Sequence, residues 1–401
     1  MSSLASADVR RHNLSLVATR LAELGSASRS DLADATGLAR GSVTALVRQL
    51  EAAELVRETE LVAASGKGRP RTLLELSGDH LAILTILIDA DHVSAVASTL
   101  GGERLVRAER RHGRPMGDPG RVLDVAAATV DAALAELAGR EVAEATVVVW
   151  APVGGEPAVV LADTDLGWGR VDAVALLAER SPRFAELAAA GRVRLVADTD
   201  VAALAEYAAT GRPSELVYLK SDSGIGGAIV VDGAPIEGGR HLAAALGHLP
   251  VVPNGVRCEC GQHGCLVTVA GPDVLLERAG LAESAREEGL TAALDAFVHR
   301  IREGEAAAVA AWDAGAAELV RTLQIVSLTV DPSVIVVGGY LAALADDLGD
   351  RLAKIQPGAD GAFLAAPPVV GSALGRDAAL VGAEQAAVSR LLADPAALAR
   401  G

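Results

Sequence analysis

Apolar residues recur at helical spacing in three successive segments near the start of the chain, and this pattern predicts three short helices. The first helix is expected to end at Gly25. The second is expected to begin at Ser28, whose hydroxyl can cap it together with Asp31, and to end at Gly37. The apolar faces of the first and third helices are Leu16, Val17, Leu21 and Leu24, and Val43, Leu46, Val47 and Leu50. Three helices with one apolar face each can bury a small shared core.

A helix-turn-helix is the motif that this pattern favours. A short helix, a tight turn and a longer helix with small polar and arginine residues at its start match that motif, in which the start of the second helix enters the major groove of DNA. Two β-runs, LVRETELVA and RTLLELSG, then predict a hairpin whose basic tip, SGKGRPR, suits phosphate or the minor groove. The expected DNA-contacting residues are Arg40, Ser42, Thr44, Arg48, Lys67, Arg69 and Arg71. Amphipathic helices and basic turns are common singly, but their order over residues 1–78 favours a winged helix-turn-helix domain.

From residue 79 onward the pattern changes to short apolar runs that alternate with helical segments. LAILTILIDADHVSAVAST predicts two strands that meet near residues 89–92, and ATVVVWAPVG, RVRLVADTDV, ELVYLKSDSGIGGAIVVDG and PSVIVVGGYLA predict further buried strands. A last helix is expected at DAALVGAEQAAVSRLL. Alternating strands and helices predict a layered α/β body that binds ligands at the strand ends.

Composition and charge narrow the class of protein. A chain of 401 residues, 51% hydrophobic and 22% charged, is expected to fold into two or three globular domains. It has no apolar run of about 18 residues and no signal-peptide core near its start, so we expect it in the cytoplasm and off the membrane. The net charge of -16 argues against a protein that coats nucleic acid, but residues 1–80 carry ten basic and ten acidic residues, so the excess acid lies in the body. Neutrality of so short a segment can also arise by chance.

All three cysteines lie within the eight residues CECGQHGC, as Cys258, Cys260 and Cys265, in a glycine-rich loop that begins ten residues after His248. Three thiolates and one imidazole complete a tetrahedral zinc shell with no open position for water, which predicts a structural zinc site. His263 is a competing fourth ligand, although a tight turn between Cys260 and Cys265 would point it outward. The other interpretation, reduced and packed cysteines without a metal, is disfavoured by three thiols this close together.

Together these motifs resemble the ROK family, named for repressors, open reading frames and kinases, over nearly the whole chain. GHLPVVPNGVRCECGQHGCL is similar to the zinc signature of the family, DSGIGGAI to its glycine-rich phosphate loop, ADTDVAALAE to its NDANAAALAE segment, DLGWGRV to its NLGW segment and DPSVIVVGG to its DPxxIVLGG segment. The winged helix with a GRP tip resembles that of the repressors, whereas the kinases begin at the body.

The resemblance implies an α/β fold in which a winged helix-turn-helix precedes a two-lobed actin/hexokinase-like (ribonuclease H-like) body. The expected domains are residues 1–78, a first lobe of residues 79–197 completed by a C-terminal helix at 376–393, and a second lobe of residues 198–375 that contains the zinc loop. The resemblance also implies homodimers or homotetramers that place two winged helices on an inverted repeat of double-stranded DNA.

Several residues that the family uses to bind and phosphorylate sugars are missing. Asp198 stands at the position of the catalytic base, and the polar sugar contacts expected at three other positions are Ala197, Ala245 and Val267. Asp198 and His248 then remain to bind an effector. Losing three such contacts, at about 1–3 kcal/mol each, would remove most of a micromolar affinity.

The nucleotide-binding segments depart from the family as well. DADHV puts Ala90 and His92 where a flexible residue and a hydroxyl are usual, and Asp222 would face a phosphate with a like charge. A shifted alignment of the loop could return Glu237 or Glu259 to the sugar site. We therefore expect no catalysis, with Asp198 a vestige of the catalytic base.

The sequence thus predicts a DNA-binding transcriptional regulator, a repressor in carbohydrate metabolism, whose body senses a sugar or sugar-derived effector and changes the spacing of the winged helices. The rival is an ATP-dependent sugar kinase with a fused DNA-binding domain, which would release ADP in a reaction that needs Asp198. A third interpretation is a regulator whose cleft is vestigial and responds to no small molecule.

Overall fold

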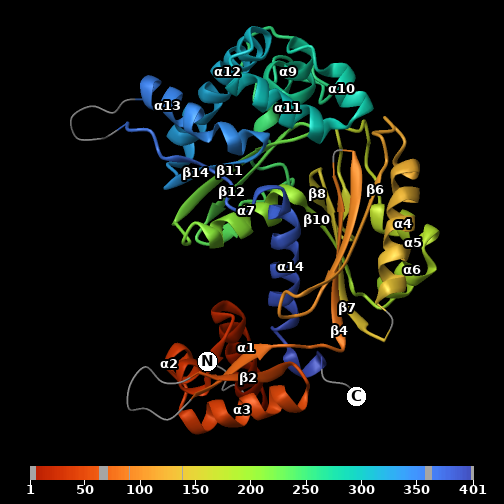
Figure 1. Ribbon diagram of the computed structural model, residues 1–401, viewed down its shortest axis with the longest axis vertical. Coiled ribbons are helices and arrows are strands. Elements are labelled where there is room, and N and C mark those ends of the chain that lie inside the picture. Colours follow the sequence, from red (N-terminus) through yellow and green to blue (C-terminus); the bar gives the residue numbers. More distant parts are fainter. Residues whose placement is uncertain (1–5, 63–70, 90, 138, 357–363, 399–401) are drawn as a thin grey trace.

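The computed structural model describes residues 6–62, 71–89, 91–137, 139–356 and 364–398, and its N-terminal unit consists of three helices and a small antiparallel sheet, which is consistent with the expected winged helix-turn-helix (Figure 1). Its elements are α1 (Ser6–Leu24), β1 (Ala27–Ser28), α2 (Arg29–Thr36), α3 (Arg40–Ala52), β2 (Val56–Val62) and β3 (Arg71–Leu76). The three strands form an antiparallel sheet of order β1-β3-β2.

Local signals in the sequence explain the turn between α2 and α3. The Ser28 Oγ accepts a hydrogen bond from the Asp31 backbone N–H at 3.3 Å, and the Asp31 carboxylate accepts one from the Ser28 N–H at 3.0 Å. Gly37 ends α2 with φ of 70°, a left-handed conformation that glycine adopts without strain. The apolar face of α3 is buried, as predicted, through Val43, Leu46, Val47 and Leu50.

A first five-stranded sheet follows, with strand order β10-β7-β4-β5-β6. The strands β4, β5 and β6 pair antiparallel, whereas β7 and β10 run parallel to β4. The elements of this part are β4 (Leu81–Ile88), β5 (His92–Ser98), β6 (Arg104–Arg111), α4 (Pro119–Glu136), β7 (Glu141–Val149), β8 (Val153–Gly154), β9 (Val159–Val160), α5 (Ala173–Arg180), α6 (Pro182–Ala189) and β10 (Val193–Ala197). Helices α4, α5 and α6 cover the outer face of the sheet (Figure 1).

A second five-stranded sheet has the order β13-β12-β11-β14-β15. Its first three strands again pair antiparallel, and its last two again run parallel to the first. The elements are α7 (Asp198–Ala209), β11 (Glu215–Ser221), β12 (Ile225–Val231), β13 (Ala234–Pro235), η1 (Leu246–His248), α8 (Val267–Ala270), α9 (Pro272–Arg278), α10 (Ala282–Glu287), α11 (Leu290–Arg302), α12 (Ala306–Val330), β14 (Val334–Gly339), η2 (Tyr340–Leu344), α13 (Ala345–Ile355) and β15 (Val369–Gly371).

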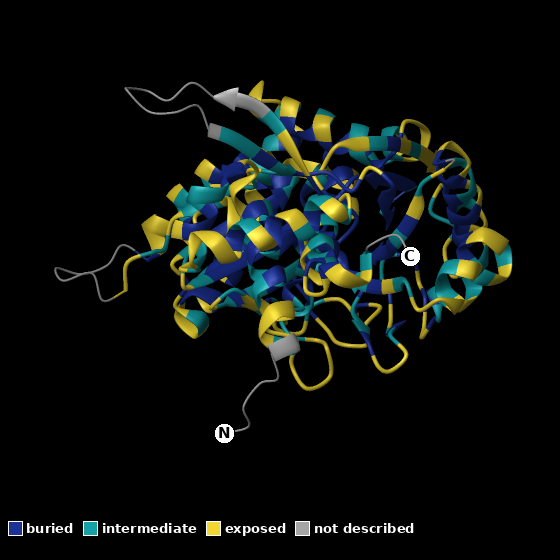
Figure 2. Ribbon diagram, turned by 90° about the horizontal axis from the view of Figure 1, so that it is seen from below, coloured by how far each residue is buried: buried dark blue, intermediate teal, exposed yellow. Residues whose placement is uncertain are grey.

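The two sheets therefore repeat one plan, in which the third, second, first, fourth and fifth strands lie side by side. This duplicated arrangement confirms the ribonuclease H-like body that the family resemblance implies. Buried residues gather in the strands and on the inner faces of the helices, while the outer helical turns are exposed (Figure 2). The core consists mainly of Val, Leu, Ile and Ala, as a chain with 2% aromatic residues requires.

Helix α14 connects the body to the N-terminal unit. The chain ends with η3 (Gly375–Asp377), α14 (Ala378–Leu391) and η4 (Pro395–Leu398). Near its start α14 packs closely on α7, because a Cβ atom at Gly382 would lie 1.9 Å from the Val201 carbonyl oxygen. Near its end, Ala387 and Leu392 belong to the same apolar cluster as the buried residues of α1 and α3 (Figure 1). One helix thus contacts both the interior of the body and the N-terminal unit.

Among the described residues, no helix combines the length and the apolar character needed to cross a membrane. The division of the chain at residues 78, 197 and 375 stays a prediction.

Candidate functional site

The face of α3 that we expect to contact DNA is open to solvent. Arg40, Ser42 and Arg48 are exposed, and Thr44 is half-buried, with its Oγ1 donating a hydrogen bond to the Arg40 carbonyl at 2.9 Å. Arg40 and Arg48 make no ion pair with any residue that the structure describes. Both guanidinium groups are therefore available to a phosphate or a base edge.

The hairpin residues are only partly described. Lys67 and Arg69 lie outside the described residues, and Arg71 is described only as the first residue of β3. The sequence did not single out Arg29, which forms ion pairs with Glu51 at 2.6 Å and with Glu58 at 2.9 Å. These pairs link the start of α2 to the end of α3 and to β2. Arg29 therefore stabilises the packing of the N-terminal unit and does not add to the exposed positive charge on α3.

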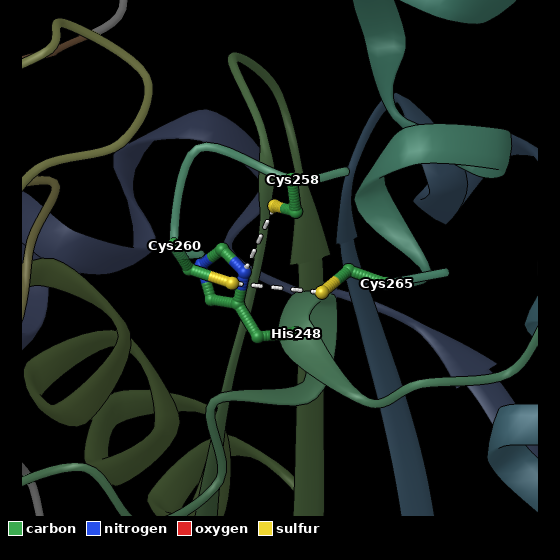
Figure 3. A group of neighbouring side chains, drawn as sticks. All are labelled: His248, Cys258, Cys260 and Cys265. Atoms are coloured by element: carbon green, nitrogen blue, oxygen red, sulfur yellow. Dashed lines mark hydrogen bonds between the residues drawn. The ribbon is translucent and has the colours of Figure 1, made fainter. Parts of the chain in front are cut away.

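Four side chains from the glycine-rich loop and η1 converge on one point (Figure 3). One ligand atom from each of His248, Cys258, Cys260 and Cys265 lies within 4.8 Å of the other three. The Cys258 Sγ is 3.6 Å from the His248 Nδ1, and the Cys260 Sγ is 3.6 Å from the Cys265 Sγ. In a tetrahedral zinc site with Zn–S bonds of about 2.3 Å, two sulfur ligands lie about 3.8 Å apart. The group can therefore hold a metal ion, whereas His263 is exposed and lies outside it.

The protonation behaviour of these four side chains is compatible with binding a cation. Burial, together with the neighbouring Cys260 and Cys258 thiols, raises the pKa of Cys265 to about 12. Burial lowers the pKa of His248, which favours the neutral imidazole that metals bind. Because thiolates are the metal-binding form, a cation would stabilise the ionised forms of Cys258 and Cys265, whose pKa values burial raises, whereas the pKa of Cys260 is already lowered. Soft thiolates with one imidazole are a donor set that suits zinc.

A cleft of about 1370 Å³ opens beside the metal-binding group. It brings together Asp198, the first residue of α7, and His248, the two residues that we expect to bind an effector. Thr164 also borders the cleft, with its Oγ1 3.5 Å from the His248 Nε2. The three positions where polar sugar contacts are missing line the same cleft, as Ala197, Ala245 and Val267.

A buried lysine, which the sequence analysis did not identify, neutralises Asp198. The Lys220 Nζ lies 3.1 Å from the Asp198 carboxylate and 3.0 Å from the Asp222 carboxylate, and 4.1 Å from the centroid of the Trp150 ring. Burial alone would lower the pKa of Lys220, but the two carboxylates outweigh burial and hold that pKa well above its usual value. Lys220 is on β11 and Trp150 follows β7, so the ammonium joins the two sheets.

The loop that follows β4 contacts α11, a helix of the second lobe. In a kinase, a phosphate would approach this loop. The Asp91 carboxylate accepts a hydrogen bond from the Leu290 N–H at the start of α11 at 3.2 Å and lies 3.5 Å from the Arg111 guanidinium. Its hydrogen bond to His92, at 3.1 Å, is the main cause of the lowered pKa of Asp91. A residue 199 positions away in sequence completes this contact, so no local pattern could have revealed it.

Asp163 is a buried cleft residue, and burial opposes the charge of its carboxylate. It is 5% exposed, and burial raises its pKa to about 7, although its Oδ1 accepts hydrogen bonds from the Asp165 and Leu166 backbone N–H groups at 2.8 and 3.0 Å. A carboxyl group with a raised pKa in the folded state favours folding below its unfolded pKa of about 4. That contribution is lost as the pH rises through about 7.

Replacing Asp163 with asparagine, which keeps the Oδ1 acceptor, is therefore expected to leave stability nearly unchanged at about pH 3.5, below the unfolded pKa. At pH 8 the variant should be more stable than the wild type by about 4 kcal/mol, because the folded pKa lies about three units above the unfolded pKa. Urea unfolding of both proteins across this pH range measures the difference. A difference that is constant with pH, or largest at low pH, would show that Asp163 is ionised without penalty.

Comparisons with known proteins agree with this architecture. A model of the ROK family matches residues 88–389. The DNA-binding transcriptional repressor Mlc of Escherichia coli (strain K12) is 25% identical over 348 residues, which cover 85% of this chain and 84% of Mlc. Kanosamine kinase of Amycolatopsis mediterranei (strain S699) is 34% identical over 150 residues, which cover 36% of this chain and 46% of the kinase.

Among solved structures, a ROK family transcriptional regulator described as a homologue of E. coli Mlc superposes with a TM-score of 0.70 at 23% identity, over 96% of this chain and 97% of that one. A ROK family glucokinase from Streptomyces griseus, in complex with glucose and AMPPNP, gives a TM-score of 0.61 at 22% identity and covers 76% of this chain and 98% of the glucokinase. The regulator thus matches nearly the whole chain, and the glucokinase matches about three quarters of it.

Proposed function

This chain belongs to the ROK family, and from that premise we propose that it is a DNA-binding transcriptional repressor whose body senses a sugar-derived effector. The observation that carries the proposal is the N-terminal unit, in which α3 presents Arg40 and Arg48 to solvent, neither of them in an ion pair with a residue that the structure describes. The similarity to the repressor Mlc covers 85% of this chain, whereas the similarity to kanosamine kinase covers 36% of it.

Helix α14 supports a route from the cleft to the DNA-binding unit. It packs on α7, whose first residue is Asp198, and its other end shares an apolar cluster with α1 and α3. His80 adds a second link, because its Nε2 lies 3.4 Å from the Leu398 carbonyl and its Nδ1 lies 3.7 Å from the Glu54 carboxylate after α3. An effector that moves α7 would therefore shift α14 and, with it, the winged helices. This requires that the effector binds two conformations of the body, which differ in the position of α14, with different affinity.

The kinase alternative is less well supported by the same cleft. A catalytic base must accept a proton from the substrate hydroxyl, but one oxygen of Asp198 is already held by the Lys220 ammonium. Ala197, Ala245 and Val267 offer no hydrogen bond to a sugar. We infer that the body binds without catalysing phosphoryl transfer.

We further propose that the four-residue metal group binds one zinc ion with a structural role. Four protein ligands complete a tetrahedral shell and leave no position for a reacting water. His248 belongs to this shell and borders the cleft, so the metal would fix one wall of the effector site. The functional unit would be a homodimer or homotetramer in the cytoplasm, with two winged helices on an inverted repeat of double-stranded DNA.

Footprinting tests the DNA-binding proposal. The purified protein is expected to protect an inverted repeat upstream of its own gene, with an affinity that falls steeply as salt rises. Arg40→Ala should weaken binding about tenfold or more, because an arginine on the groove-facing helix contributes about 1–3 kcal/mol.

Arg121→Ala is the matched control, since Arg121 is an exposed arginine on α4 in the body. It should bind like the wild type. No protected site at low salt, or equal affinity of the Arg40→Ala and Arg121→Ala variants, would refute the proposed role of α3.

A further inference from the structure

Charged side chains at the end of β6 join the first sheet to helices of the second lobe. Arg114 follows β6 and forms a two-pronged ion pair with the Asp273 carboxylate on α9, at 3.0 and 3.1 Å. Arg111, the last residue of β6, lies 3.5 Å from the Asp91 carboxylate, which also accepts a hydrogen bond from the Leu290 N–H of α11 at 3.2 Å. These five residues form a charged seam between the lobes. Figure 1 shows this end of the first sheet beside α10 and α11, at the far end of the molecule from the N-terminal unit.

The second lobe has no side chain at the point where it meets the Asp91 carboxylate. Gly289 precedes α11, and a Cβ atom there would lie 2.8 Å from the Asp91 Oδ2 and 2.9 Å from a guanidinium nitrogen of Arg111. Its φ of 106° is also a conformation that other residues rarely adopt. Any side chain at this position would push the two lobes apart, so the seam depends on a close approach that only glycine allows.

The charged seam differs in kind from the other contact between the lobes. The side chains of Arg111 and Asp273 are 51% and 60% exposed, and exposed ion pairs are individually weak and screened by salt. By contrast, Leu87 of the first sheet packs in one buried apolar cluster with Leu216 and Val336 of the second sheet. The apolar cluster therefore acts as the fixed joint, and the charged seam is the contact that can open and close around it.

The start of α14 is held by the same two elements that the seam brings together. Arg107 of β6 lies 3.4 Å from the Asp377 carboxylate in η3, and Arg376 in η3 forms an ion pair with Asp295 of α11. Since η3 directly precedes α14, one short segment is held by β6 and by α11 at once. If β6 and α11 separate, both ion pairs cannot be kept, and the start of α14 must move.

The N-terminal unit also contacts both lobes. Its apolar cluster includes Leu81 and Ile83 of β4 in the first lobe. Glu23, near the end of α1, lies 3.8 Å from Arg212, which stands between α7 and β11 of the second sheet. A change in the angle between the lobes would therefore alter the contacts that orient the N-terminal unit, in addition to moving α14.

We propose that the charged seam is a latch that holds the two lobes in the arrangement that binds DNA, and that opening it releases the winged helices from the orientation that the operator requires. This proposal rests on the proposed function, because it names the movement of the body that controls DNA binding. Arg111 and Arg114 are then positioning residues, which act on the operator through α14 and do not touch it. A latch of weak ion pairs suits this role, since a modest free energy of effector binding is enough to open it.

Charge-reversal variants of the full-length protein test the latch: Arg114→Asp, Asp273→Arg and the double variant. Each single reversal places like charges opposite each other, so the Leu290 N–H should exchange with deuterium about tenfold or more faster than in the wild type. If about a tenth of the molecules stays latched, the affinity for the operator measured by footprinting falls about tenfold. The double variant restores a pair of opposite charges and should return both quantities to within about threefold of the wild type.

Arg121→Asp is the matched control, because it makes the same change of charge at an exposed position on α4 of the first lobe. It should change neither quantity. The proposal is overturned if the single variants exchange at Leu290 like the wild type, if they exchange faster but bind the operator equally well, or if the double variant recovers neither quantity. The exchange measurement needs no DNA. A wild type that protects no operator refutes the proposed function, whereas unchanged exchange in the single variants refutes the latch alone.

Discussion

Replacing Cys265 with serine is expected to abolish stable zinc binding and to unfold the loop that carries the metal group. Cys265 is fully buried, and its Sγ is one of four converging ligand atoms. Losing one of four ligands should weaken zinc binding by more than the about 10–100-fold that removal of an outer partner costs. Since zinc can contribute on the order of 10 kcal/mol to the folding of a small metal-binding unit, thermal unfolding should begin at a clearly lower temperature in the variant.

The loop around the metal group has little else to hold it. Its internal hydrogen bonds include the Val252 N–H to the Gly264 carbonyl at 3.1 Å and the Cys258 N–H to the Gln262 carbonyl at 2.8 Å, but much of residues 253–263 is exposed. His248 would also lose the metal that orients its ring, so the wall of the cleft beside Thr164 should loosen. We therefore expect chelation to weaken effector binding as well as stability.

His263→Ala is the control for this experiment, since His263 lies in the same loop but outside the ligand group. Elemental analysis should find about one zinc per chain in the wild type and in the His263→Ala variant, and far less in Cys265→Ser. Far less than one zinc in freshly purified wild type, or equal loss from the His263→Ala variant, would show that the ligand set is wrong.

The parts of this protein that the sequence predicts well are those set by local rules. Ser28, Asp31 and Gly37 fix the ends of α2 through contacts within a few residues, and the spacing of apolar residues fixes the buried face of α3. The close spacing of the three cysteines likewise predicts that their side chains lie near one another, because eight residues of loop cannot separate them far. His248 is ten residues from Cys258, near enough for the same argument.

The parts that the sequence does not predict depend on contacts between distant segments. Lys220 lies in an apolar run, VYLKS, where a lysine is an anomaly that signals a buried partner without naming it. Its contact with Trp150 requires that β7 and β11, which belong to different sheets, end at the same place. The Arg390–Glu144 pair, 246 positions apart, is set in the same way by the packing of α14 on the first sheet. Tertiary structure decides such contacts, and local propensity carries no information about them.

Lys220 is accordingly the position where a single substitution should destabilise the body most. Lys220 is 6% exposed, and its ammonium group compensates the charges of Asp198 and Asp222 at once. Lys220→Met keeps a long unbranched side chain but leaves two buried carboxylates without a cation, which is expected to cost about 3–5 kcal/mol. Urea unfolding measures the loss. Lys354→Met, at an exposed position on α13, should be close to neutral.

The pH dependence and a rescue variant separate this cause from a packing defect. Burial already raises the pKa of Asp222 to about 6 in the wild type, although Lys220 opposes the shift. Without Lys220 that pKa should rise further, so stability of the Lys220→Met variant is retained below the unfolded pKa of about 4 and lost as the pH rises through about 6 and beyond. The loss of stability relative to the wild type should therefore grow between pH 5 and pH 8.

A rescue variant tests the same cause. Adding Asp198→Asn and Asp222→Asn to Lys220→Met removes both uncompensated charges and should recover most of the lost stability. The reason is that a buried ion pair contributes little net stability compared with neutral groups of similar size. If the deficit is the same at every pH and the triple variant is no more stable than Lys220→Met, the lysine acts through its shape and not through its charge.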